Sequence, residues 1–117
     1  MADYGHNSGA IDIDRAIADA EELFVNAGQA KVRAEGLDMR RKRVRATLFV
    51  KYKGEGHSIG ASSEMAEADP VYELACADWE SAAMEAETLR AQAEAKRMRF
   101  EAWRTSNATK RAQMQLR

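Results

Sequence analysis

The chain contains 117 residues, of which 32% are charged, and its formal net charge is −1 at pH 7. This length predicts a single domain, and the absence of any run of about 18 apolar residues argues against a membrane-spanning helix. The net charge is close to zero, whereas most nucleic-acid-binding domains are clearly positive. The single cysteine excludes an internal disulfide. Abundant alanine and a polar N-terminus without a leader pattern favour a long-helical protein of the cytoplasm.

Residues 1–10 lack any apolar period, so we expect a flexible arm there, followed by one helical domain over residues 11–117. The first helix is predicted over about 12–53, and a bend near Gly36 is an alternative to a straight course. The seam of this helix, meaning the row of residues expected to face a partner helix, contains Ile13, Ala16, Ala20, Leu23, Ala27, Ala30, Ala34, Leu37, Arg41, Val44 and Leu48.

A connector is predicted over residues 54–69, because three glycines fall within seven consecutive residues at its start. A short helical turn is expected within residues 62–68. Asp69 followed by Pro70 is a strong start signal, since aspartate caps helices and proline fits the first helical position. The second helix is therefore predicted over about 70–115.

The second helix carries a seven-residue repeat on several faces, which is typical of a coiled coil. Its seam contains Tyr72, Ala75, Trp79, Ala82, Ala86, Leu89, Ala93, Lys96, Phe100, Trp103, Asn107, Lys110 and Met114. Separate rows contain Glu73, Glu80, Glu87, Glu94 and Glu101, and Arg90, Arg97, Arg104 and Arg111. Because most of these arginines stand three or four residues from a glutamate, the rows predict a ladder of ion pairs. Arg111 lacks such a neighbour, which leaves a freer basic end.

Charge alternates along the chain in four blocks. Residues 1–30, 31–53, 54–89 and 90–117 carry net charges of −5, +7, −9 and +6, counted from lysine, arginine, aspartate and glutamate. Folding the second helix back on the first places opposite charges side by side, whereas parallel self-pairing places like charges together. The sequence thus predicts an all-α fold, an antiparallel two-helix coiled-coil hairpin with a flexible N-terminal arm.

Two registers of this hairpin remain open. One pairs Leu48 with Ala75 and places Arg41 opposite Ala82. The other is slipped by one heptad and pairs Leu37 with Trp79. The first places large side chains against small ones along most of the seam. The slipped register, which also pairs Ile13 with Trp103, remains an alternative.

Apolar side chains also lie outside both seams, and a lone hairpin would leave them uncovered. The candidate residues of this protein-binding or dimer face are Ile17, Phe24, Phe49, Met84 and Met98. A homodimer that forms a four-helix bundle and the binding of another protein both fit this pattern.

Clustered cations attract phosphates, so two basic clusters are candidate contacts for nucleic acid or an acidic partner. Their residues are Lys42, Arg43, Lys51, Lys53, Arg104, Lys110, Arg111 and Arg117. In the hairpin Lys42, Arg43, Lys51 and Lys53 are expected to point outward, but the absence of an overall basic bias favours a solvated, charge-paired face over phosphate contact. The C-terminal cluster is therefore the better candidate.

The sequence shows no arrangement typical of catalysis, metal binding or cofactor binding. His6 and His57 lie in glycine-rich segments, and residues 54–60 match neither a dinucleotide-binding nor a phosphate-binding loop. We therefore expect no enzymatic activity, no metal or other cofactor and no small-molecule substrate.

The segment Gly5 to Gly9, with the sequence Gly-His-Asn-Ser-Gly, resembles the N-terminal arm of GapR-type nucleoid-associated proteins, which are small helical DNA binders. The residues that follow depart from that family's helical pattern, so its DNA-clamping role is not carried over. The tail from Phe100 through Trp103 to Met114 is similar to the ends of small coiled-coil proteins of phages and prophages.

These resemblances imply a non-catalytic accessory to replication or recombination in the cytoplasm of a bacterial host, with nucleic acid as a candidate partner. One alternative is an inhibitor of a host defence complex, of anti-CRISPR or anti-restriction type, whose acidic stretch 55–87 imitates DNA. A further alternative is a structural subunit of a particle.

Overall fold

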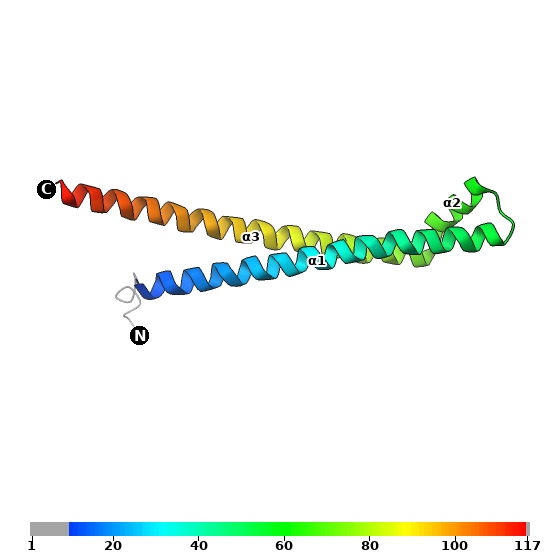
Figure 1. Ribbon diagram of the computed structural model, residues 1–117, viewed down its shortest axis with the longest axis horizontal. Helices are drawn as coiled ribbons and strands as arrows, with labels where there is room; N and C mark the ends of the chain where they lie inside the picture. Colours follow the sequence, from blue (N-terminus) through cyan, green and yellow to red (C-terminus); the bar gives the residue numbers. More distant parts are fainter. Residues whose placement is uncertain (1–9, 117) are drawn as a thin grey trace. The chain divides into compact units, whose positions relative to one another are not determined.

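Three α-helices make up the described part of the chain (Figure 1). The computed structural model describes residues 10–116, with side chains from Ile13 onward. Helix α1 spans Ala10–Gly54, α2 spans Ile59–Ala68 and α3 spans Pro70–Gln115. No strand occurs in this part, and none of its helices contains an apolar stretch long enough to traverse a bilayer. The all-helical prediction is confirmed, whereas the predicted arm lies, up to residue 9, outside the described residues.

The end of α1 follows from local sequence signals. Gly56 has a φ of 97°, in the left-handed region that glycine adopts without steric cost. The Gly56 N–H donates to the Lys53 carbonyl at 3.1 Å, and the His57 N–H donates to the Tyr52 carbonyl at 3.4 Å. These two hydrogen bonds form a Schellman motif, which satisfies carbonyls at the helix end. α1 therefore ends at Gly54, close to its predicted boundary.

Capping side chains precede α2 and α3. The Ser58 hydroxyl accepts a hydrogen bond from the Ala61 N–H at 3.1 Å, and the Asp69 carboxylate accepts one from the Val71 N–H at 2.8 Å. The cap at Asp69 is the one that the sequence predicts. However, α2 is a helix of 10 residues rather than a short turn, because the cap at Ser58 lets it begin earlier than expected.

The contacts divide the chain into two units, which are described separately. Unit 1 contains the residues up to Ala27 and from Thr88 onward, and unit 2 contains Gly28–Glu87. Both long helices contribute a segment to each unit, and α2 belongs to unit 2. Within unit 2, α1 passes through Gly36 without a break.

In unit 2, α1 and α3 run in opposite directions. Arg33 on α1 forms an ion pair with Glu85 on α3 at 3.5 Å. Close to the other end of this segment, the Tyr52 hydroxyl donates a hydrogen bond to the Asp69 carboxylate at 2.6 Å. That bond lowers the pKa of Asp69 and raises the pKa of Tyr52 relative to their ordinary values. Residue numbers thus rise along α1 as they fall along α3, which is consistent with a helical hairpin.

The contacts of unit 2 are compatible with both predicted registers. The guanidinium carbon of Arg41 lies 4.2 Å from the centre of the Trp79 ring. The first register places Val44, three residues after Arg41, opposite Trp79, and the second places Leu37, four residues before Arg41, at that position. Val44 and Leu48 line the same groove as Val71.

Small residues dominate the buried positions. The buried side chains are Ala30, Ala34, Leu48, Ser62, Ala66, Ala75 and Ala82 in unit 2, and Ala93 in unit 1. Every predicted seam residue of α3 from Tyr72 to Phe100 is buried or half-buried, but Trp103, Lys110 and Met114 are exposed. The helical period therefore predicts the covered face correctly as far as Phe100.

Arg45 attaches α2 to α1. Its Nε and Nη2 atoms donate to one carboxylate oxygen of Glu67 at 3.0 and 2.9 Å, and Nη2 also donates to the Ser63 hydroxyl at 2.8 Å. These bonds hold the outer side of α2, while Ser62 and Ala66 are buried on its inner side.

The Ser62 hydroxyl is fully buried and finds no hydrogen-bond partner among the described residues. Replacing Ser62 by alanine is expected to raise the free energy of unfolding by about 1 kcal/mol, because the cost of desolvating the hydroxyl disappears. Urea denaturation followed by circular dichroism measures this change. Ser63→Ala is the matched control, and it should lower stability because that hydroxyl accepts a bond from Arg45. A less stable Ser62→Ala protein would contradict the prediction.

Candidate functional site

The first predicted basic cluster is largely engaged within the protein. Lys42 pairs with Asp38 at 3.3 Å. The Lys53 ammonium donates to the His57 carbonyl at 3.4 Å, and the Lys51 ammonium lies 5.2 Å from the centre of the Tyr52 ring. These contacts tie the three lysines to neighbouring groups of α1 and of the turn that follows it.

Arg43 is the exception in this cluster. It borders the groove that Val44, Leu48 and Val71 line, and it makes no ion pair with any side chain of residues 13–116. Arg40, which also borders this groove, makes no ion pair with those side chains either. Two cations beside an apolar groove offer little affinity for a phosphate chain, because that affinity depends on several simultaneous contacts.

Arg41, a charged residue in the predicted seam, is also engaged. Its guanidinium donates to the Asp38 carboxylate at 2.7 Å and stacks on the Trp79 ring. Burial alone would lower the pKa of Arg41, and the hydrogen bonds to Asp38 raise that pKa above its ordinary value. Partial burial likewise opposes ionisation of Asp38, but the bonds from Lys42 and Arg41 lower its pKa.

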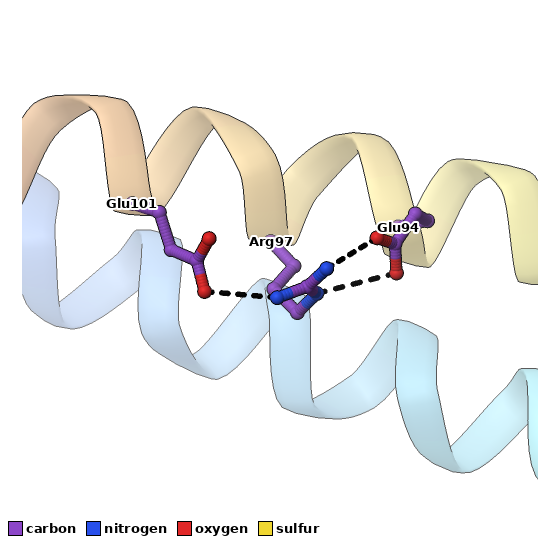
Figure 2. Close-up of polar contacts among 3 residues, drawn as sticks. All are labelled: Glu94, Arg97 and Glu101. Carbon is purple, nitrogen blue, oxygen red and sulfur yellow. Dashed lines mark hydrogen bonds and ion pairs between the residues drawn. The ribbon is translucent and has the colours of Figure 1, made fainter.

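The predicted ladder of ion pairs is present around Arg97 in unit 1. Figure 2 shows Arg97 between Glu94 and Glu101, with bonds to both. The Arg97 Nη1 atom donates to Glu101 at 2.9 Å, and the hydrogen bond from Arg97 lowers the pKa of Glu94 below its ordinary value. Glu101 is also three residues before Arg104, but the structure pairs it with Arg97. Arg104 therefore loses the glutamate that the sequence offers it.

The C-terminal segment of α3 carries three cations without an ion pair. Arg104, Lys110 and Arg111 are exposed and make no ion pair with any side chain between Ile13 and Leu116. Arg117, which the sequence adds to this cluster, lies outside the described residues. Arg104 and Arg111 are seven residues apart and share one face of α3, while Lys110 lies about 100° around the helix axis from Arg111.

An aromatic pair adjoins this basic surface. The rings of Phe100 and Trp103 stack with their centres 6.0 Å apart and their planes inclined by 22°. Trp103 is 40% exposed although the sequence assigns it to the seam. A shallow depression beside it is also lined by Arg104, Asn107 and Arg111. We call these five residues the C-terminal face of α3.

Sequence reasoning found the cations of this face but missed the availability of the Trp103 ring. The helical period places Phe100, Trp103 and Asn107 on one side of α3, because they are three and four residues apart. That period alone does not say where the partner helix begins. Both predicted registers place a residue of the first helix opposite Trp103, so no signal in the sequence separates its ring from the covered seam residues before it.

The predicted apolar face is partly assembled in unit 1. Ile17, Phe24 and Phe100 line a small apolar groove, in which Phe24 is 45% exposed. Met84 and Met98 are exposed, whereas Phe49 is half-buried within unit 2. The structure therefore brings Ile17 and Phe24 together in this groove, which Phe49, Met84 and Met98 do not line.

Among the described residues, no group of three or more histidine, cysteine, aspartate or glutamate side chains is arranged to hold a metal ion. The C-terminal face of α3 places cations without an ion pair beside a partly exposed indole ring. Comparison of the chain with protein-family models, curated proteins and solved structures finds no match.

Proposed function

We propose that this protein is a non-catalytic helical interaction protein of phage type, an accessory to DNA replication or recombination in the cytoplasm of a bacterial host. It contacts nucleic acid through the C-terminal face of α3 together with Lys110. The observation that carries the proposal is the set of three exposed cations, Arg104, Lys110 and Arg111, that lack an ion-pair partner among residues 13–116.

The contrast with Arg97 supports this choice. Two glutamates neutralise Arg97, so a phosphate would have to displace them. Arg104 and Arg111 present donors without such competition, and arginine binds phosphate oxygens with two hydrogen bonds at once. Release of counterions from the nucleic acid then supplies most of the binding free energy.

We further propose that α1 and α3 form an antiparallel coiled coil and that the protein is a homodimer with a four-helix core. The opposite run of the helices in unit 2 and the small buried residues support the coiled coil, because alanine permits close approach of helices. The groove at Ile17 and Phe24 supports self-association, since exposed apolar side chains are covered in most stable assemblies.

The alternative is inhibition of a host defence complex by imitation of DNA. Glu64, Glu73 and Glu80 favour it, because they are exposed and make no ion pair with any described side chain. Such a protein would bind a basic partner surface and would not bind nucleic acid.

A titration of labelled oligonucleotide by fluorescence anisotropy tests the proposal. At about 50 mM salt we expect binding, and replacing Arg104, Lys110 and Arg111 by glutamine should weaken it at least about tenfold. The slope of log K against log salt concentration should also fall by about 2, because three phosphate contacts are lost.

The matched control replaces Lys42, Arg43 and Lys53 by glutamine, which removes the same charge from unit 2. This control should bind almost as well as the unmodified protein. Circular dichroism of both triple variants shows whether they keep their helix content. Absence of binding at about 50 mM salt, or equal loss in both variants, would overturn the proposal and favour the protein-binding alternative.

A further inference from the structure

We infer that the ligand of the C-terminal face of α3 is single-stranded nucleic acid, with a base stacked on Trp103 and the backbone phosphates bound by Arg104 and Arg111. This inference rests on the proposed function and names the class of nucleic acid. It is carried by the juxtaposition of a supported, partly exposed indole ring with unpaired cations on consecutive turns of one helix.

The position of Trp103 is fixed from one side. Phe100 stacks on it at 6.0 Å, and Phe100 itself lies against Ile17 and Phe24 in the apolar groove. The indole is therefore backed by the packed part of unit 1, while 40% of the residue stays accessible. A ring held in place loses little conformational entropy when a base stacks on it.

The cations are placed to follow a backbone past that ring. Arg104 and Arg111 are seven residues apart on α3, which corresponds to about 10.5 Å along the helix axis. Asn107 lies between them and lines the same depression, where its amide group can donate to a phosphate or a base edge. Glu101, the acidic side chain at the edge of the depression, is already paired with Arg97 at 2.9 Å.

An exposed aromatic ring distinguishes single strands from duplexes. In a duplex the faces of the bases are hidden in the stack, so Trp103 could meet only backbone or groove edges. In a single strand the bases can unstack and lie on an aromatic side chain while the phosphates meet a basic groove. Rings beside cations are therefore the arrangement that proteins use for single strands, largely without sequence preference.

Tryptophan fluorescence and binding competition test the inference on the full-length protein. The chain has two tryptophans, so Trp79→Phe leaves Trp103 as the reporter. A single-stranded oligonucleotide of about 20 thymidines should quench this emission as it binds. Parallel titrations with single-stranded RNA and with single-stranded DNA show which of the two the protein prefers. Binding of either one supports the inference. A duplex of the same length should compete at least about tenfold less well than the single strand.

Substitutions at Trp103 provide the second measurement. Trp103→Ala should weaken single-strand binding about tenfold, while Trp103→Phe should stay within about threefold of the unmodified protein because it keeps an aromatic face. Met114→Ala, an exposed apolar change on the same helix, is the control and should leave binding unchanged. Circular dichroism confirms that each variant keeps its helices.

The inference is overturned if a duplex binds as tightly as the single strand, if binding leaves Trp103 emission unchanged, or if Trp103→Ala binds like the unmodified protein. Failure of this kind is separable from failure of the proposed function. A protein that binds duplex DNA and depends on Arg104, Lys110 and Arg111 keeps the proposed function and loses the inference. A protein that binds no nucleic acid at about 50 mM salt loses both.

Discussion

An aspartate in place of Ala66 should lower the free energy of unfolding by about 3 kcal/mol, because it buries a carboxylate without a partner. Ala66 is 0% exposed on the inner side of α2. Arg45, the α1 cation that contacts α2, already binds Glu67 and Ser63 on the outer side. The new carboxylate must therefore stay uncompensated, bind a proton or force α2 away from α1.

Urea denaturation measured by circular dichroism gives the size of this effect, and amide hydrogen exchange in α2 shows whether that helix detaches first. Ala68→Asp is the matched control, since it introduces the same group two residues later on an exposed position of the same helix. Its free energy of unfolding should stay within about 0.5 kcal/mol of the unmodified protein. Similar losses in the two variants would show that α2 does not pack as the structure describes.

Ala93→Leu should have the second-largest effect, a loss of about 2 kcal/mol in the free energy of unfolding. Ala93 is 1% exposed on the covered face of α3 in unit 1. A larger side chain there must push α3 away from its neighbour or adopt a strained rotamer. Alanine at this position therefore reflects close packing rather than helix propensity alone.

Ala91→Leu provides the comparison, because Ala91 is exposed on the same helix and receives the same change. Leucine and alanine are both strong helix formers, so this control should alter the free energy of unfolding by less than about 0.5 kcal/mol. Thermal melts of the two variants side by side measure the difference. If Ala93→Leu melts at or above the temperature of Ala91→Leu, the site of Ala93 has room for leucine. That result would contradict the close packing inferred at this position.

The helix boundaries were predictable because their signals are local. Asp69 caps the helix that Pro70 begins, and Gly56 supplies the left-handed residue that ends α1. The full length of α2 was not predictable in the same way, because Gly60 weakens a helix at that point. Burial of Ser62 and Ala66 compensates for this weakness, and burial depends on the rest of unit 2.

The candidate site was predictable in its charges and not in its aromatic component. The spacing of glutamates along α3 indicated which arginines would be neutralised, and the contacts of Arg97 agree. The spacing left Glu101 able to pair with either Arg97 or Arg104, and only the structure shows which arginine it takes. The exposure of Trp103 depends on the register between two helices, which the heptad pattern leaves open.

The stacking of Arg41 on Trp79 has a consequence for how unit 2 avoids sliding. Alanine layers such as Ala34, Ala75 and Ala82 differ little from one another, so a helix displaced by seven residues meets almost the same surface. The interaction of a cation with an indole face does not repeat along the seam in this way. A displacement of α3 by seven residues would bring Ala86 to the guanidinium in one direction and Tyr72 in the other, so the contact with the indole ring would be lost in both. Arg41 thus distinguishes one alignment from others that the apolar layers would accept almost equally well, much as a buried polar residue fixes the alignment of other helix pairs.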